Sequence, residues 1–131
     1  MVVSILGVAG LYAVRLQGKI NKSSNEAIRA SAGGASAVEY GRRMISIDSG
    51  WRSRHSNDRW MGDVAFDGGK ITYKLVDALD GDLNNSATHS VRIYGKSTLG
   101  KATRIQSVEL APSVTGKMVP VAGTWRQEVL P

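Results

Sequence analysis

Cysteine is absent from this chain of 131 residues. The protein therefore cannot form a disulfide, a thiolate metal site or a cysteine nucleophile. Aromatic residues make up only 6% of the sequence, and 11 acidic residues stand against 17 lysines and arginines. The resulting net charge of +6 permits anionic partners without requiring them. With 42% hydrophobic residues, the chain is neither disordered by composition nor a polytopic membrane protein, and its length allows one domain.

The motifs of common enzyme classes are also missing. There is no G-x-S-x-G elbow, no G-x-x-x-x-G-K phosphate loop and no dinucleotide fingerprint, because Gly33-Gly34 lies inside a helical pattern and not after a strand. The histidines, His55 and His89, lie in separate segments and do not make a zinc site by themselves. We expect both to be surface residues or to be hydrogen bonded within the protein. The sequence thus predicts no catalytic residues, no resident cofactor and no enzyme.

The most apolar stretch is Met1–Val14, which carries no charge. Fourteen helical residues rise about 21 Å, which is short of the roughly 30 Å hydrocarbon core of a bilayer. No basic residue precedes the run, and the helical spacing continues past Arg15, so a secretory signal peptide is disfavoured. A buried helix of a soluble protein and a segment covered by lipid or by other subunits are the remaining interpretations.

Helical spacing of apolar residues continues from this stretch to residue 47. The pattern predicts one amphipathic helix of more than forty residues, which the sequence Asp48-Ser49-Gly50 ends. Its many alanines and serines would let other helices approach closely, while Gly18, Gly33 and Gly34 would loosen or bend it. Residues 1–47 hold six basic and two acidic residues. The apolar positions are Ile5, Val8, Tyr12, Leu16, Ile20, Ala27, Ile28, Ala35, Val38 and Ile45.

After residue 50 the spacing changes to the alternation that is typical of strands. Asp63–Asp67 and Lys70–Asp77 flank the turn signal Gly68-Gly69, which predicts a β-hairpin. Ser90–Tyr94 and Lys101–Leu110 alternate in the same way. The second part of the chain is therefore predicted to form antiparallel strands.

The remaining strand signals complete the predicted fold. Ser97–Gly100 is a plausible turn, and a last strand lies either in Lys117–Val121 or in Thr124–Val129. Pro120 indicates an edge position. We therefore predict an α+β fold in which a long N-terminal helix (residues 1–47) packs on a small antiparallel sheet of four or five strands in a β domain (residues 48–131).

One segment gathers the oxygen ligands that calcium prefers. Asp80, Asp82 and Asn84 stand at positions one, three and five of a calcium-loop pattern. The pattern then fails, because Val91 occupies the place of the closing glutamate. Asp-Gly and Asn-Asn sequences are also favoured in turns without an ion. Calcium is a weak candidate here, and a solvated strand connection is the alternative.

A second segment combines arginines with tryptophans and could bind an anionic ligand. The acidic residues Asp58 and Asp63 dilute its charge, so nucleic acid is not expected as a partner. In the alternative interpretation, the tryptophans seal the helix onto the sheet, and the arginines stack on them or pair with carboxylates. The residues of this segment are Trp51, Arg52, Arg54, Arg59 and Trp60.

A helix of this length exceeds what the remaining short strands can cover. Its first half must be buried by lipid or by other copies of the chain. Copies that pack head to tail make a contact that does not close on itself, and such a contact generates a filament.

The sequence resembles the type IV pilins and related pseudopilins. Met1–Leu11 is similar to their apolar N-terminal segment, in which a Met-Val-Val-type run follows a short stretch with a glutamate. Gly68–Ile71, Asp80–Asp82 and Gly123–Arg126 are similar to a glycine-led strand, an Asp-Gly-Asp connection and a Gly-Thr-Trp-Arg close in pilin-like proteins. The glutamate, the processing junction, the helix-breaking proline and the C-terminal cysteine pair of many pilins have no counterpart here.

The resemblance implies a structural subunit that waits in the inner membrane and is then assembled by pilus or secretion machinery into an extracellular filament. Self-association would be its main interaction. A minor pilin or type II secretion pseudopilin is one alternative. A membrane-anchored module that binds an anionic ligand or nucleic acid through the arginine-tryptophan segment is another. The residues implied to form the assembly interface are Val2, Ile5, Val8, Tyr12, Leu16 and Ile20.

Overall fold

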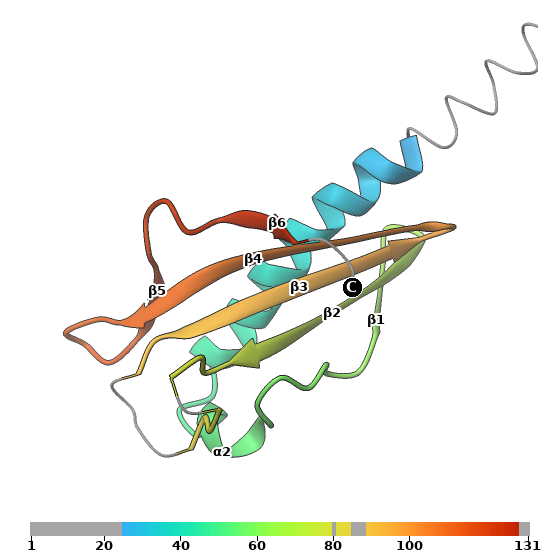
Figure 1. The fold of residues 1–131 in the computed structure, drawn as a ribbon. Helices are drawn as coiled ribbons and strands as arrows, with labels where there is room; N and C mark the ends of the chain where they lie inside the picture. Colours follow the sequence, from blue (N-terminus) through green and yellow to red (C-terminus); the bar gives the residue numbers. More distant parts are fainter. Residues whose placement is uncertain (1–24, 80, 85–88, 129–131) are drawn as a thin grey trace, which may run out of the picture.

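The computed structural model describes residues 25–79, 81–84 and 89–128. A helix spans residues 25–46 and is followed by one short helical turn and six strands (Figure 1). The predicted α+β class, with a helix packed on an antiparallel sheet, is confirmed. The later elements are α2 (Trp51–Arg54), β1 (Val64–Phe66), β2 (Gly69–Val76), β3 (Val91–Leu99), β4 (Ala102–Pro112), β5 (Met118–Pro120) and β6 (Arg126–Glu128).

The sheet has more strands than the sequence predicted. Its order is β1-β2-β3-β4-β5, and β6 also pairs with β4, all antiparallel. Leu110–Pro112 of β4 pairs with β5, while Ile105–Ser107 pairs with β6. Both C-terminal segments thus form strands. β4 is long enough to pair with each of them in turn along the edge that does not pair with β3. The predicted choice between the two segments was wrong.

Two predicted turns are displaced in the structure. The β1–β2 turn lies at Asp67-Gly68, both with positive φ (48° and 80°), and Gly69 already belongs to β2. Such φ values are typical of the tight hairpin turns that match the twist of the strands. The β3–β4 turn centres on Gly100-Lys101, so Ser97–Leu99 is strand and not turn.

The helix crosses one face of the sheet (Figure 1), and in the described part of the chain the opposite face carries no helix. Its buried face consists mainly of small side chains, which allow the helix backbone to approach the strands. A Cβ on Gly95 of β3 would lie 2.5 Å from both the Gly34 carbonyl oxygen and the Val38 nitrogen. The buried helix residues are Ala30, Gly33, Gly34, Ala37, Val38, Gly41 and Ile45.

Gly33 and Gly34 therefore have a packing role that the sequence did not reveal. A Cβ on Gly33 would collide with the Ser97 side chain, and Gly34 lies over Gln106 and the Arg104 carbonyl oxygen. The expected loosening of the helix at these glycines is not observed, since residues 25–46 form one continuous helix. The small residues serve contact with the chain's own sheet.

The core lies between the helix and the three longest strands. Leu75, Ile93, Val108 and Leu110 are at most 1% exposed, and they pack with Val38 of the helix. Within the residues that the structure describes, every buried side-chain nitrogen or oxygen has a hydrogen-bond partner. The buried polar side chains of this part are thus all hydrogen bonded.

Polar contacts near the start of the described helix fix it to the β1–β2 turn and to β4. Arg29 Nη2 donates to the Asp67 carbonyl oxygen at 2.7 Å, in the β1–β2 turn. Gln106 Nε2 donates to the Ser31 carbonyl oxygen at 2.8 Å. The helix is held to the sheet from Arg29 onward.

The predicted end of the helix is confirmed. The helix stops at residue 46, and the Gly50 amide donates a hydrogen bond to Asp48 Oδ1 in the segment that follows.

Candidate functional site

The predicted assembly interface lies outside the described residues. This holds for the whole apolar segment Met1–Val14 and for all six interface residues, which are Val2, Ile5, Val8, Tyr12, Leu16 and Ile20. No helix among the residues that the structure describes is long and apolar enough to cross a membrane. The helix over residues 25–46 is the element to which the segment is attached.

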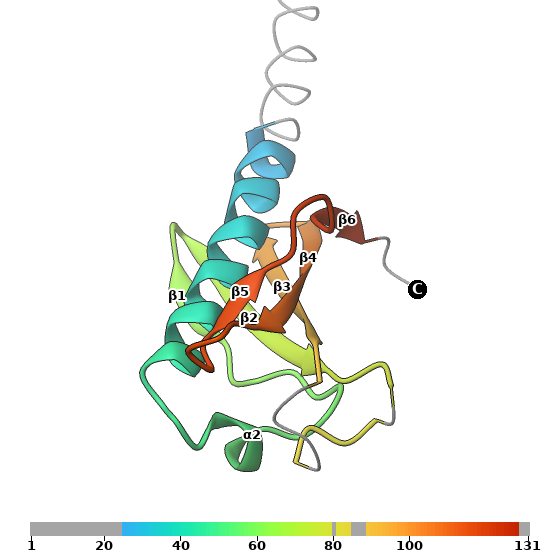
Figure 2. The same cartoon turned by 90° about the vertical axis from the view of Figure 1, so that its left-hand side faces the viewer.

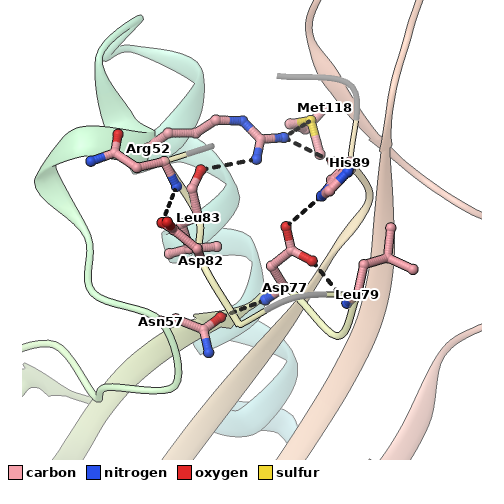
Figure 3. A network of polar contacts seen from close by, with 9 residues as sticks. Arg52, Asn57, Asp77, Leu79, Asp82, Leu83, His89 and Met118 are labelled. Carbon is pink, nitrogen blue, oxygen red and sulfur yellow. Dashed lines mark hydrogen bonds and ion pairs between the residues drawn. The ribbon is translucent and has the colours of Figure 1, made fainter. Parts of the chain in front are cut away.

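The loop after β2 is anchored by a network around Asp77 (Figure 3). The carboxylate of Asp77 is fully buried, accepts a hydrogen bond from the Leu79 amide at 2.9 Å and lies 3.0 Å from His89 Nδ1. The Asp77 amide donates to Asn57 Oδ1 at 2.6 Å. This network joins the ends of the connection between β2 and β3, so we assign it a structural role.

Arg52 completes that network from α2. Its guanidinium donates to the carbonyl oxygens of Leu83 at 3.2 Å and His89 at 2.8 Å. Burial lowers the pKa of Arg52, and the nearby Asp77 carboxylate acts in the opposite direction. Arg52 is thus committed to main-chain oxygens inside the protein.

The calcium candidate is only partly within the described residues. Asp80 lies outside them, and the Asn84 amide donates to Asp82 Oδ1 at 2.9 Å, which forms a local turn. The described residues contain no group of three or more His, Asp or Glu side chains that could hold a metal ion. The calcium assignment therefore stays a prediction.

The five residues of the arginine-tryptophan segment point in different directions. Trp51 is only 8% exposed and belongs to the core, and the Arg52 guanidinium stacks 4.5 Å from its ring centroid. Arg54 pairs with Asp48 at 2.9 Å, and Arg59 is exposed. For Trp51, the interpretation as a seal between helix and sheet is confirmed.

Trp60 lies elsewhere, against the sheet face that carries no helix. The Nζ atoms of Lys74 and Lys96 lie 4.8 and 4.5 Å from its ring centroid, and Lys74 Nζ is also 5.0 Å from the ring of Tyr94. Asp58 pairs with Lys74 at 2.6 Å. We call Trp60, Lys74, Tyr94 and Lys96 the outer-face cluster.

The strand pairing explains why these residues meet. Tyr73 and Leu75 point toward the helix, so Lys74 between them points away. In the antiparallel register, Lys74 lies opposite Tyr94, and Lys96 lies two residues further along β3. The Met61 amide donates to the Tyr73 carbonyl oxygen, which places Trp60 beside β2. Sequence reasoning missed the two lysines, because only the register brings them to the tryptophan.

More charged groups lie on the same face. Arg92 donates to Ser107 Oγ at 2.8 Å and to the Thr124 carbonyl oxygen at 3.1 Å. Burial opposes ionisation of Glu128, but hydrogen bonds from Ser107 and Arg126 outweigh it and lower the pKa of that carboxyl. The face is therefore cationic, with part of its charge neutralised internally.

The histidines are hydrogen bonded within the protein, as expected. His55 makes two hydrogen bonds. Its Nδ1 lies 2.6 Å from the carbonyl oxygen of Trp51, and its Nε2 lies 2.8 Å from the hydroxyl oxygen of Tyr73. Burial is the main cause that raises the pKa of Tyr73 to about 12, and the charges of Tyr40 and Asp48 add to it. The phenol is held in its neutral form beneath the helix.

This shift predicts how Tyr73 contributes to stability at alkaline pH. The pKa of Tyr73 is about 12 in the folded protein and about 10 in the unfolded chain. The stabilisation that the neutral phenol gives to the folded state is therefore complete below pH 10 and is lost as the pH rises toward 12. At pH 8, Tyr73→Phe should cost about 1 kcal/mol through the lost hydrogen bond. Above pH 10 the variant should overtake the original protein. Urea unfolding of both proteins at pH 8, 10 and 11 measures this, and a constant difference would contradict it.

No family model, curated protein or solved structure matches the chain. The functional interpretation therefore depends on its own residues and geometry.

Proposed function

We propose that the protein is a structural subunit of an extracellular, type IV pilus-like filament and that it polymerises through its apolar N-terminal segment. One contrast carries the proposal. The described residues form a packed helix-on-sheet unit without an unsatisfied buried polar side-chain atom, whereas Met1–Val14 is an uncharged apolar run on the same chain. An apolar run of this kind requires cover by lipid or by protein.

The proposed mechanism uses both environments in turn. Before assembly, Met1–Val14 is covered by inner-membrane lipid, and in the filament it is covered by neighbouring subunits. Apolar burial contributes about 25 cal/mol per Å². Exposed ion pairs such as Arg29–Asp67 contribute at most about 1 kcal/mol, so contacts of the segment dominate assembly.

The fold also suits a subunit that transmits load along a fibre. Force on the N-terminal segment enters the helix, where Arg29 and the contacts of Gly33 and Gly34 hold it flat against the sheet. The load is then spread over a long helix-sheet contact and does not act on one loop.

Analytical ultracentrifugation of the full-length chain after detergent removal tests the proposal. We expect large particles whose mass grows with protein concentration, because a head-to-tail contact does not close. A monomer, or a closed oligomer whose size is independent of concentration, would contradict it.

A minor pilin or a secretion pseudopilin uses the same helix-led assembly. These alternatives differ from a bulk subunit in stoichiometry. The chain should be the main component of purified filaments if it is the bulk subunit, and a trace component if it caps or primes them.

The outer-face cluster supports a second candidate function, which is binding of an anionic polysaccharide. Five cations lie on the face without a helix, against the acidic residues Asp58, Glu109 and Glu128. The lysine nitrogens stand over the ring of Trp60, so anionic groups would meet ammonium groups and not a free aromatic face. The cations are Lys70, Lys74, Arg92, Lys96 and Arg126.

The double variant Lys74→Gln/Lys96→Gln tests this second function. Binding to heparin, used as the probe, should weaken about tenfold at low salt, because two charges are removed from one contact surface. The matched control is Lys101→Gln/Lys117→Gln, which removes two exposed lysines located elsewhere. Equal weakening in both double variants, measured by affinity chromatography and titration, would contradict a defined site.

A further inference from the structure

A hollow of about 500 Å³ opens at the end of the long helix. One wall is the last helical turn with the residues that follow it, and the other is the hairpin between β4 and β5. Its floor contains the buried side chains of Ile45 and Trp51. Ile47 is 70% exposed and Val119 is 43% exposed, and both line the hollow. Apolar surface is thus presented to the outside at this position.

The polar groups of the hollow indicate what it can accept. Among the residues that the structure describes, the charged residues of the lining are Arg42 and Lys117, and Arg42 is already paired with Glu39 at 2.7 Å. No acidic side chain of this described part lines the hollow. The rest of the lining combines the apolar residues Ile45, Ile47, Trp51, Met118 and Val119 with the hydroxyl groups of Ser46, Ser49 and Thr115. Its apolar side can accept apolar side chains of a partner segment without charge. Met1–Val14 is the stretch of this chain with that composition.

The position of the hollow excludes an intramolecular contact with a straight helix. The lining of the hollow includes Ile45 and Ser46 at the end of the helix and Trp51 of α2. Figure 2 shows α2 by that end of the helix, while the described start of the helix, in blue, lies at the opposite end. A helix over residues 25–46 separates these ends by about 30 Å. Since the sequence predicts helical spacing from Ile5 onward, we expect the apolar segment to lead away from the hollow of its own copy.

We infer that the hollow receives apolar side chains from the segment Met1–Val14 of a second copy. This inference rests on the proposed function and specifies its contact. A segment leaving one end of each copy binds the hollow at the other end of the next copy. The contact joins two different surfaces, so repetition gives an open filament with a defined direction.

Charge substitutions in the hollow test the inference. Ile47→Glu and Val119→Glu place a carboxylate on exposed positions, so both variants should fold as the original protein does. Filament mass in a pelleting assay should fall at least about tenfold, because a carboxylate would be buried against an uncharged segment. Leu79→Glu is the matched control, since Leu79 is 72% exposed and lines a different hollow. Its filaments should be unchanged.

The absence of cysteine allows a direct mapping of the contact. Copies carrying Val119→Cys would be mixed with copies carrying Ile5→Cys, Val8→Cys or Tyr12→Cys and oxidised in the assembled state. At least one mixture should form a mixed disulfide, because a disulfide requires Cβ atoms about 4 Å apart. The control replaces Val119→Cys with Leu79→Cys and should give no mixed disulfide.

The outcomes separate this inference from the proposed function. Normal filaments from both hollow variants, or mixed disulfides that form equally with Leu79→Cys, would overturn the inference and leave the filament function standing. Failure of the original protein to polymerise would overturn the filament function itself. Loss of filaments in the two hollow variants together with a specific mixed disulfide would establish the contact.

Discussion

Gly95→Ala is expected to cost about 3 kcal/mol or more of folding free energy, because the added methyl group would meet helix backbone. The added Cβ would lie 2.5 Å from the Gly34 carbonyl oxygen and the Val38 nitrogen. Both are backbone atoms of the helix, so no side chain can rotate away, and the helix must move off the sheet. Thermal unfolding should show a melting temperature lowered by about 10 °C or more.

Two further glycines provide the comparison series. A Cβ on Gly41 would approach Ile93 Cδ1 and the ring of Tyr73, which are side-chain atoms that can shift. Gly41→Ala should therefore cost about 1 to 2 kcal/mol, with part offset by better helix propensity. Gly62→Ala meets nothing within 4 Å and should be nearly neutral. Equal melting temperatures for Gly95→Ala and Gly62→Ala would contradict the close helix-sheet contact.

Tyr12→Asp or Leu16→Asp is expected to abolish polymerisation while the sheet remains folded. Either change places a charge in the apolar stripe that the proposed filament buries, and a buried unpaired carboxylate costs several kcal/mol. The described core contains neither residue, so its stability should be retained. Pelleting assays measure the polymer, and circular dichroism with thermal unfolding measures the fold.

A matched variant controls for a general effect of negative charge. Ala122→Asp adds the same group at an exposed position beyond β5 and should leave both polymer and fold unchanged. Intact filaments from Tyr12→Asp and Leu16→Asp would exclude the helical stripe as the assembly interface. Unfolding of the sheet in these variants would contradict its independence from the segment.

The strands that the sequence predicted best are those with strong apolar alternation. Ile71, Tyr73 and Leu75 mark β2, and Ile93 marks the middle of β3. The last part of β3, Ser97–Leu99, was predicted as a turn, because the inward positions Gly95 and Ser97 under the helix carry no hydrophobic signal. Close helix packing requires small residues at these places, and small residues hide the pattern that identifies a strand.

Features that depend on strand register could not be predicted from local spacing. Lys74 and Lys96 are far from Trp60 in sequence, and only the pairing of β2 with β3 brings the three together. The same applies to Arg52, which reaches carbonyl oxygens of the loop between these strands. The local sequence shows that arginines lie near tryptophans along the chain, but it does not show on which face of the sheet each side chain lies.

The interpretation of the small residues changed for a similar reason. Alanines and glycines in a helix indicate close approach of some partner, but not which one. In the structure, Ala30, Ala37 and Gly41 are buried, and a Cβ on Gly41 would meet side chains of the chain's own sheet. In the proposed filament, contact with other subunits is therefore assigned to Ile5, Tyr12 and Leu16, which lie further toward the start of the sequence.

Negative-stain electron microscopy of the full-length protein, purified from membranes and freed of detergent, tests the central claim most directly. A helical homopolymer built by repetition of one head-to-tail contact predicts unbranched filaments of uniform width. Leu16→Asp, prepared in the same way, should give none. Discrete particles of one size from the original protein, under conditions in which the sheet is folded, would contradict the account.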